Sequence, residues 1–265
     1  MALVGYTFIR NMFKYDYPLR EAVFSLLPAV DRYLICECFS DDGTYAEVLR
    51  WQREEPKVRV FRHQWGDHYT IQQTLANFLL DKVAPGDWCF KLDADEAMHE
   101  ESWKLFQSLP DLLQSKGAVG ARFHYTHFMG NYQTEFDFMY RRVKRFVQQG
   151  HGWRHDGDAC QLDGGEGKFV DVDVEIFHYG KVHEPKVGLL KEQDFQALYT
   201  DIGFPDPKLK AMSEAIGGID YHYLFEGAAK RGEVRHFTGT HPKIMAKRIS
   251  EAREGGWEQF ERVMP

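Results

Sequence analysis

The sequence predicts an α/β protein with a mostly parallel central sheet flanked by helices, in a Rossmann-like arrangement. Strand-like and helix-like segments alternate through the first hundred residues, which is typical of stacked βα units. The length of 265 residues suits one large domain, or a domain with a C-terminal extension. An apolar content of 43% with 28% charged residues is ordinary for a chain that buries a core.

The first half of the chain contains four predicted strands and two predicted helices. The strands are expected at 3–9, 32–39, 57–63 and 85–93, and the helices at 18–27 and 68–83. Both helical segments carry apolar residues at helical spacing, for example Leu19, Val23 and Leu26. Polar residues and Gly43 predict a turn directly after the second strand.

The pattern changes after about residue 117, where longer, aromatic-rich strands follow at 118–128 and 169–180. Helical spacing returns at 189–199, and a stretch with several Gly and Pro residues follows at 202–220. We therefore expect one domain with two halves and a helical extension packed on it. The predicted boundaries are 1–190 for the domain, 1–117 and 118–190 for its halves, and 191–265 for the extension.

Composition excludes several classes of partner. A formal charge of −7 and a pI near 5.9 argue against nucleic acid or anionic lipid as the main partner. No segment has the 18 or more apolar residues of a membrane span, and the N-terminus is expected to form a strand and not a signal peptide. Buried, reduced thiols are expected at Cys36, Cys38, Cys89 and Cys160. The predicted location is the cytoplasm, and a peripheral position at the inner face of the membrane is an alternative.

Three carboxylates follow the fourth strand within four residues: Asp93, Asp95 and Glu96. Carboxylates this close raise one another's pKa unless a positive charge lies among them, and a divalent cation is the simplest such charge. The acidic pair Asp41 and Asp42 follows the second strand, so both clusters are expected at the carboxyl edge of the sheet. Open α/β sheets bind ligands at this edge. A charged helix N-terminus is the alternative for the first cluster, and a simple turn for the second.

Four motifs occur in an order that resembles the family-two glycosyltransferases of the GT-A fold. They are "TFIRN", "SDDGT", "LDADE" and "FHYG", and the resemblance spans about residues 5–190. It implies transfer of a sugar, with inversion, from a UDP-, GDP- or dTDP-sugar to a saccharide or lipid-linked acceptor. It also implies Mn²⁺ or Mg²⁺ on the Asp-x-Asp motif.

The resemblance assigns roles to individual positions. The implied nucleotide-sugar-binding residues are Thr7, Arg10, Asn11, Asp41, Asp42, Gln73 and Asp93. Arg10 is equally well explained as a surface arginine. Many relatives carry an Arg-Asn pair where this chain has Gln72 and Gln73, and a neutral amide cannot replace a guanidinium against phosphate. Binding of the donor's diphosphate is therefore expected to depend more on the metal ion than it does in those relatives.

The implied metal ligands are Asp93, Asp95 and His178, with His183 as a weaker substitute for His178. Alternation in the last predicted strand would place His178 with the core valines, but its position near the strand's end favours a ligand.

Inverting transfer also needs a general base. Asp156, then Asp158, and next Glu166 are the candidates, with an Asx turn as the alternative for the aspartates. Trp153 and His155 are expected to shape the acceptor pocket.

Two other function classes compete with this prediction. A haloacid-dehalogenase-like phosphohydrolase also places Asp-x-Asp after a strand, with the first aspartate as nucleophile. That class usually has the motif near the N-terminus, followed by Thr or Val, whereas Glu96 and Ala97 follow here. The other alternative is a non-catalytic module that binds a nucleotide sugar or a metal.

Overall fold

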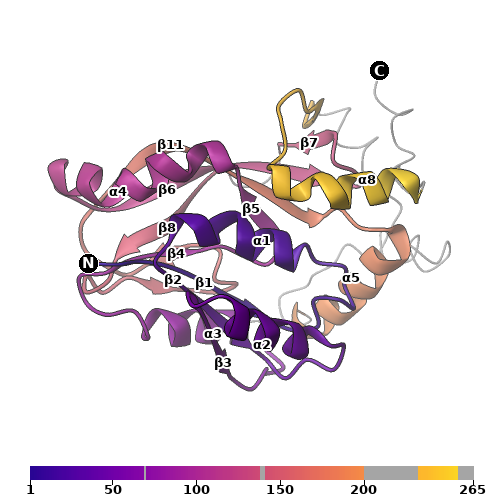
Figure 1. The fold of residues 1–265 in the computed structure, drawn as a ribbon, viewed down its shortest axis with the longest axis horizontal. Coiled ribbons are helices and arrows are strands. Elements are labelled where there is room, and N and C mark those ends of the chain that lie inside the picture. The colour runs from indigo at the N-terminus through magenta and orange to yellow at the C-terminus, as the bar shows by residue number, and fades with distance from the viewer. Residues whose placement is uncertain (69, 138–140, 200–231, 256–265) are drawn as a thin grey trace.

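The computed structural model describes residues 1–68, 70–137, 141–199 and 232–255. Four parallel strands form the first half of its central sheet in the order β3-β2-β1-β4. They are β1 (Leu3–Ile9), β2 (Arg32–Glu37), β3 (Val58–Arg62) and β4 (Trp88–Lys91). The predicted fold class, α/β with a parallel core flanked by helices, is confirmed (Figure 1).

The sheet continues past β4 with strands of mixed direction. β8 (Arg142–Gln148) lies antiparallel between β4 and β6 (Ala118–Met129), and β11 (Lys168–Lys181) pairs parallel to β6. The short strand β5 (Glu96–Met98) pairs antiparallel to β11. At the far edge lie β7 (Thr134–Phe136) and β12 (Val234–His236), and a separate two-stranded ribbon contains β9 (Arg154–His155) and β10 (Leu162–Asp163).

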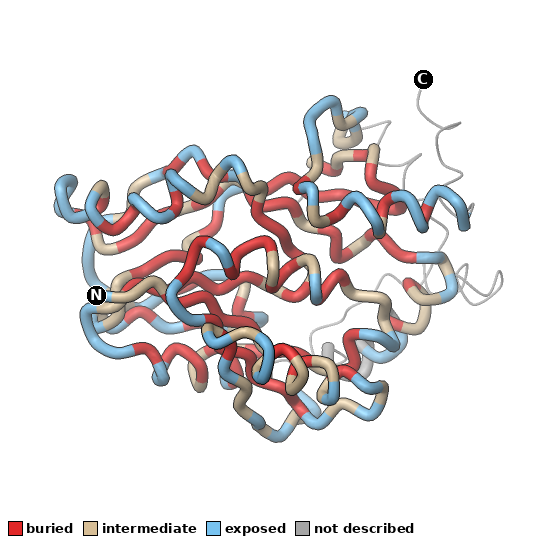
Figure 2. The backbone as a smooth tube through the Cα atoms, in the orientation of Figure 1, coloured by how far each residue is buried: buried red, intermediate tan, exposed pale blue. Residues whose placement is uncertain are grey.

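Helices cover both faces of the parallel strands. One apolar cluster joins α1 (Leu19–Leu26), α2 (Thr44–Glu54) and α4 (Trp103–Ser115) to one face of the sheet. A second cluster joins α3 (Ile71–Leu80) and the β9–β10 ribbon to the opposite face. Successive residues of β2 alternate between the two clusters, as a pleated strand requires. Buried backbone accordingly runs along the central strands, while the exposed backbone lies mainly in helices and loops (Figure 2).

The remaining described elements lie after β11 or are short helical turns. They are α5 (Pro185–Tyr199), α8 (Ala246–Glu254), η1 (Leu27–Ala29), η2 (Glu100–Ser102) and η4 (Lys243–Met245). A third apolar cluster packs Met245 and Ile249 against Phe128 and Tyr179 of the sheet. The Gly- and Pro-rich stretch 202–220 lies outside the described residues, and the proposed domain boundaries remain a prediction.

No helix in the described parts of the chain combines the length and the apolar character needed to cross a membrane.

Gly120 lies where β6 is closely approached by its neighbours. A Cβ atom at this position would lie 2.4 Å from the Phe169 ring and 2.7 Å from the Phe146 carbonyl oxygen. Backbone cannot move away as a flexible side chain can, so we expect Gly120→Ala to lower the free energy of unfolding by about 1–3 kcal/mol. Urea denaturation measures this change.

Gly66→Ala is the matched control, because its added Cβ would find the Ile71 side chain at an ordinary 3.4 Å. We expect it to alter stability by less than about 0.5 kcal/mol. Equal effects of the two substitutions would contradict the close packing inferred at Gly120.

Candidate functional site

A tight turn connects β4 to β5 and carries the acidic motif. The Glu96 N–H donates to the Asp93 carbonyl oxygen at 3.0 Å, and the Asp93 N–H donates to Glu96 Oε2 at 2.9 Å. The Tyr179 N–H of β11 donates to the Asp95 carbonyl oxygen at 2.8 Å. These bonds fix the turn at the carboxyl end of β4 and place Asp95 beside the last residues of β11.

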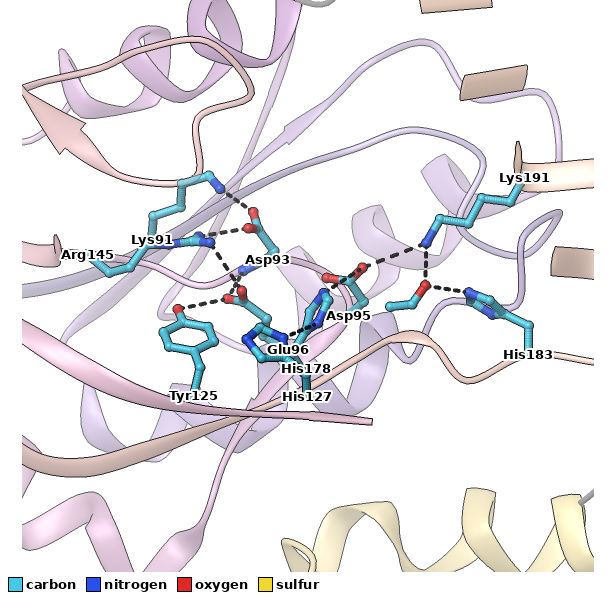
Figure 3. Close-up of polar contacts among 11 residues, drawn as sticks. Lys91, Asp93, Asp95, Glu96, Tyr125, His127, Arg145, His178, His183 and Lys191 are labelled. Carbon is cyan, nitrogen blue, oxygen red and sulfur yellow. Dashed lines mark hydrogen bonds and ion pairs between the residues drawn. The ribbon is translucent and has the colours of Figure 1, made fainter. Parts of the chain in front are cut away.

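Two buried cations neutralise one side of this turn. Arg145 of β8 donates from Nη1 to Asp93 Oδ2 at 2.7 Å and from Nη2 to Glu96 Oε1 at 3.2 Å. Lys91 Nζ donates to the other oxygen of Asp93, and the Tyr125 hydroxyl lies 3.5 Å from Glu96 Oε2 (Figure 3). Arg145 and Lys91 are each 1% exposed, so these are interior ion pairs and not surface contacts.

The surroundings shift the pKa values of Asp93 and Glu96 in opposite directions. Burial raises the pKa of Asp93, but Arg145 and Lys91 outweigh it, and the pKa lies below its ordinary value. Burial dominates at Glu96, whose pKa is raised. The charge compensation expected from a metal ion is therefore supplied, at Asp93 and Glu96, by protein side chains.

Asp95 lies apart from these pairs and faces His178 (Figure 3). Asp95 Oδ2 and His178 Nε2 are 3.7 Å apart, too far for a direct hydrogen bond. Gly180 makes room for both, because a Cβ atom there would lie 2.5 Å from Asp95 Oδ2 and 2.6 Å from His178 Nε2. Burial raises the pKa of Asp95, but His178, Lys191 and His183 together hold it well below its ordinary value. Asp95 is therefore an ionised carboxylate.

A second histidine holds the ring of His178. The Nδ1 atoms of His127 and His178 are 2.9 Å apart, and the two residues are paired across β6 and β11. Only one of these nitrogens can carry the shared hydrogen when both rings are neutral. If a cation were bound between the two side chains, donation of this hydrogen by His178 would leave a lone pair on His178 Nε2 for the cation. Without a cation, that lone pair would face the Asp95 carboxylate unfavourably.

Lys191 of α5 adds a positive charge on the other side of Asp95. Its Nζ donates to the Gly180 carbonyl oxygen at 2.7 Å and lies 3.9 Å from Asp95 Oδ2. His183 Nε2 lies 2.9 Å from the same carbonyl oxygen, so it carries the hydrogen. Burial keeps the pKa of His183 low, and its buried Nδ1 has no partner among the described residues. Lys191 and His183 together hold the Gly180 carbonyl in place.

The predicted metal ligands differ in how well they suit a cation. Asp95 and His178 supply an oxygen and a nitrogen across the space that Gly180 leaves open. The carboxylate suits Mn²⁺ or Mg²⁺, whereas an imidazole nitrogen suits a transition metal better than Mg²⁺. Asp93 suits one less well, because each of its oxygens is bound by a cationic side chain. Among the described residues, no group of three His, Cys, Asp or Glu side chains converges on one point.

The loops after β1 and β2 are joined by Asn11. Its N–H donates to Ser40 Oγ at 2.9 Å, and its Oδ1 accepts from the Asp41 N–H at 3.0 Å. Thr7 Oγ1 and Arg10 Nε are buried without a hydrogen-bond partner in the described structure. The predicted nucleotide-binding residues of these two strands thus lie at one edge of the sheet.

Asp41 and Asp42 have different surroundings. Asp42 accepts the N–H groups of Thr44 at 3.0 Å and Lys14 at 2.8 Å, so both of its oxygens serve the turn before α2. The Asp41 side chain is exposed, and no hydrogen bond or ion pair to its carboxylate is found within the described ranges. Asp41 is thus the more accessible of the two for a ligand.

The predicted base residues lie in the turn between β9 and β10. The Gly157 N–H donates to Gln73 Oε1 of α3 at 3.1 Å. This bond places the turn beside Gln73, one of the predicted nucleotide-sugar-binding residues. Asp156 and Asp158 are both exposed, but Asp158 Oδ1 accepts the Cys160 N–H at 2.9 Å in an Asx turn. In the described residues no hydrogen bond or ion pair links this turn to Asp95.

Three more predicted residues lie around this turn. His155 is buried and lies 2.6 Å from the Tyr6 hydroxyl, and Trp153 Nε1 donates to the Glu166 carbonyl oxygen at 3.2 Å. The Glu166 side chain is exposed. His155 and Trp153 therefore pack the interior side of the turn.

The sequence analysis missed the cations of this region, Lys91, Arg145 and Lys191. Lys91 ends an apolar strand next to the acidic turn, and this isolated charge could have been recognised from the sequence. Arg145 lies in a basic segment, "RRVKRF", which gives no sign that one of its charges is buried. Lys191 lies on a helix that reaches Asp95 only through the tertiary fold.

Comparisons with known proteins were made on sequence and on structure. No protein-family model and no curated protein match the chain. TarS from S. aureus is 11% identical, with a TM-score of 0.48 over 88% of this chain and 74% of that chain. A mannosyltransferase from Pyrobaculum calidifontis, solved with GDP-Man and Mn²⁺, is 12% identical, with a TM-score of 0.47 over 98% of this chain and 83% of that chain. GalNAc-T7, solved with UDP, GalNAc and Mn²⁺, is 12% identical at a TM-score of 0.45, over 86% of this chain and 57% of that chain.

These structural neighbours include glycosyltransferases. Their TM-scores all lie below 0.5, so we base no conclusion about this chain's activity on them.

The buried pairs at the acidic turn lead to a prediction about Arg145. Replacing it with Met leaves Asp93 and Glu96 without their shared cation in a buried position. We expect Arg145→Met to lower the free energy of unfolding by about 3–5 kcal/mol at neutral pH, as measured by urea denaturation.

Arg142→Met is the control on the same strand, because Arg142 pairs with Asp171 at the surface. We expect it to cost less than about 1 kcal/mol. Similar losses for the two variants would show that the Arg145 pairs do not hold the turn.

Proposed function

We propose that the protein is a metal-assisted glycosyltransferase that moves a sugar, with inversion, from a nucleotide-diphosphate sugar to an acceptor hydroxyl. The observation that carries the proposal is the Asp95–His178 pair at the carboxyl end of β4, with Gly180 leaving space between the two side chains. The ordered sequence motifs support the same activity.

Asp95 and His178 would hold the Mn²⁺ or Mg²⁺ ion. The bound ion would neutralise the donor's diphosphate and so ease departure of the nucleotide. Asp95 is suited to this role because it is ionised, and His178 because His127 can accept its Nδ1 hydrogen. Asp93 would instead orient the turn or meet a sugar or ribose hydroxyl, since Arg145 and Lys91 already engage its charge.

The chain's own cations would assist at the diphosphate. Lys191 brings a buried ammonium group to the side of Asp95, and Arg10 lies at the end of β1 with its Nε unpaired in the described structure. Positive groups held in place before the reaction stabilise the charge that develops on a leaving phosphate. Lys191 and Arg10 would supply the positive charge that Gln72 and Gln73 do not carry.

Asp156 is the proposed general base for the acceptor hydroxyl. Both aspartates are exposed, but Asp158 Oδ1 accepts a hydrogen bond within its own turn, and no such bond to the Asp156 carboxylate is found among the described residues. The proposed donors are UDP-, GDP- and dTDP-sugars, and the proposed acceptor is a saccharide or a lipid-linked acceptor. Phosphohydrolase chemistry is less well supported, because Asp93, which would be its nucleophile, has both oxygens paired with cations.

Asp95 gives the sharpest test of the metal site. We expect Asp95→Asn to lower Mn²⁺-dependent donor turnover by about 100-fold or more, since even loss of an outer-shell partner costs about 10- to 100-fold. EDTA should abolish wild-type donor binding, as measured by calorimetry with UDP. The melting temperature should fall less than in Asp93→Asn, because the cationic partners of Asp95 lie 3.7 and 3.9 Å away, whereas Asp93 accepts hydrogen bonds from two cations.

Asp93→Asn is the matched variant, and it should destabilise the fold because it weakens the pairs with Arg145 and Lys91. UDP binding that is equally strong in EDTA, or full turnover by Asp95→Asn, would disprove the metal assignment.

The base assignment is tested separately by Asp156→Asn. We expect this change to lower sugar transfer by about 10²- to 10⁴-fold, the usual contribution of a general base. UDP and Mn²⁺ affinity should stay near wild type, because the proposed metal ligands lie on other elements. Rates are measured as sugar transfer and as donor hydrolysis, and hydrolysis is expected to fall less.

Asp158→Asn is the control in the same turn, and its transfer rate should stay within a few-fold of wild type. If only Asp158→Asn loses activity, Asp158 is the base. If both variants transfer at the wild-type rate, the base lies elsewhere, and Glu166 is the next residue to test.

A further inference from the structure

Phe39, two residues after the end of β2, combines a strained backbone with an exposed side chain. Its φ angle is 54°, in the left-handed region that bulky L-residues rarely adopt. Phe39 is 49% exposed, so burial gives only partial compensation for this conformation. Strained residues of this kind concentrate at functional sites, where the surrounding structure holds them in place.

Arg62 holds the ring of Phe39 from one side. The Arg62 guanidinium carbon lies 3.7 Å from the centre of the Phe39 ring and 4.0 Å from that of Tyr45. Its Nε donates to Glu37 Oε2 at 2.9 Å, and Glu37 is fully buried. The guanidinium is thus fixed, and the Phe39 ring is a rigid apolar surface that still reaches solvent.

This ring lies at the edge of the sheet where the nucleotide is proposed to bind. Residues 40 and 41, which follow it, are hydrogen-bonded to Asn11 in the loop after β1. The Asp41 side chain beside it is exposed. A planar aromatic ring backed by a cation, next to an accessible carboxylate, suits a nucleobase, which offers a π-face for stacking and N–H groups for hydrogen bonds.

We propose that Phe39, backed by Arg62, is the platform on which the donor's nucleobase stacks. This inference rests on the proposed function, and it adds a residue that recognises the base and not the diphosphate. Stacking accepts any base, so this contact contributes affinity for uracil, thymine and guanine alike. A glycine would fit the backbone at this position better, and contact with the base accounts for a phenyl ring there.

Phe39→Gly tests the proposal, because it removes the ring and relieves the strain at once. We expect calorimetry in Mn²⁺ to show UDP affinity reduced by about tenfold or more, the usual size of a base-stacking contribution. Affinity for inorganic pyrophosphate should be unchanged. The melting temperature should change little, because relief of the positive φ offsets loss of the contact between the ring and Arg62.

Three further variants sharpen the result. Phe39→Asn also tolerates this φ without a ring and should match Phe39→Gly, whereas Phe39→Tyr keeps the ring and should bind UDP like wild type. Phe13→Ala removes another exposed ring, 52% exposed, from the loop after β1, and should not change UDP affinity.

Wild-type UDP affinity in Phe39→Gly, or an equal loss of pyrophosphate affinity, would overturn the stacking role of Phe39. Neither result would contradict the proposed glycosyltransferase function. An equal loss of UDP affinity in Phe13→Ala would also overturn the stacking role, because the effect would then be one of general surface apolarity. If the wild-type protein binds none of UDP, GDP and dTDP, the proposed function fails and this inference fails with it.

Discussion

The interaction between Arg145 and the two carboxylates of the acidic turn organises the candidate site. A buried arginine between Asp93 and Glu96 offsets two charges that would otherwise repel each other in the interior. With these charges compensated, the turn can lie flush against β8 and β11, and Asp95 alone faces away from the cations of β4 and β8. One ion-pair network thus distinguishes Asp93, whose two oxygens are paired with cations, from Asp95, which faces His178.

The geometry of β8 explains how an arginine reaches this position. In the pairing of β6 with β8, Ala121 lies opposite Phe146 and Arg122 opposite Lys144, so Arg145 is the extra residue of a bulge. A bulge interrupts the alternation of side chains and can turn one of them toward the other face. Arg145 thereby reaches the end of β4, while Arg142 on the same strand pairs at the surface.

Local patterns in the sequence predicted the parallel half of the fold well. Apolar segments gave β1 to β4 in order, and helical spacing gave α1 and α3, because these elements depend on neighbours in the chain. The placement of the acidic turn at the carboxyl edge followed from the same pattern. The pairing between segments distant in the sequence could not be predicted from these local patterns. The strand β12, for example, is three residues long and is defined by its pairing with β7 in the described structure.

The candidate site was predictable to a similar degree. The sequence placed Asp95 and His178 near a strand end, and the structure brings them within 3.7 Å. Lys91 beside the acidic turn was a detectable signal, but the sequence gave no indication that Arg145 would contact Asp93, because that contact depends on the register of β8. Asp42 and Asp158 illustrate how turn chemistry and ligand binding draw on the same residue types, and their hydrogen bonds favour the turn.

The most direct test of this account is the location of a metal ion in crystals grown with MnCl₂ and UDP, by anomalous diffraction at the manganese edge. The account predicts one peak within about 2.5 Å of both Asp95 Oδ2 and His178 Nε2, in contact with the diphosphate. A peak bound by Asp93 and remote from His178, or bound UDP with no peak at Asp95, would contradict it.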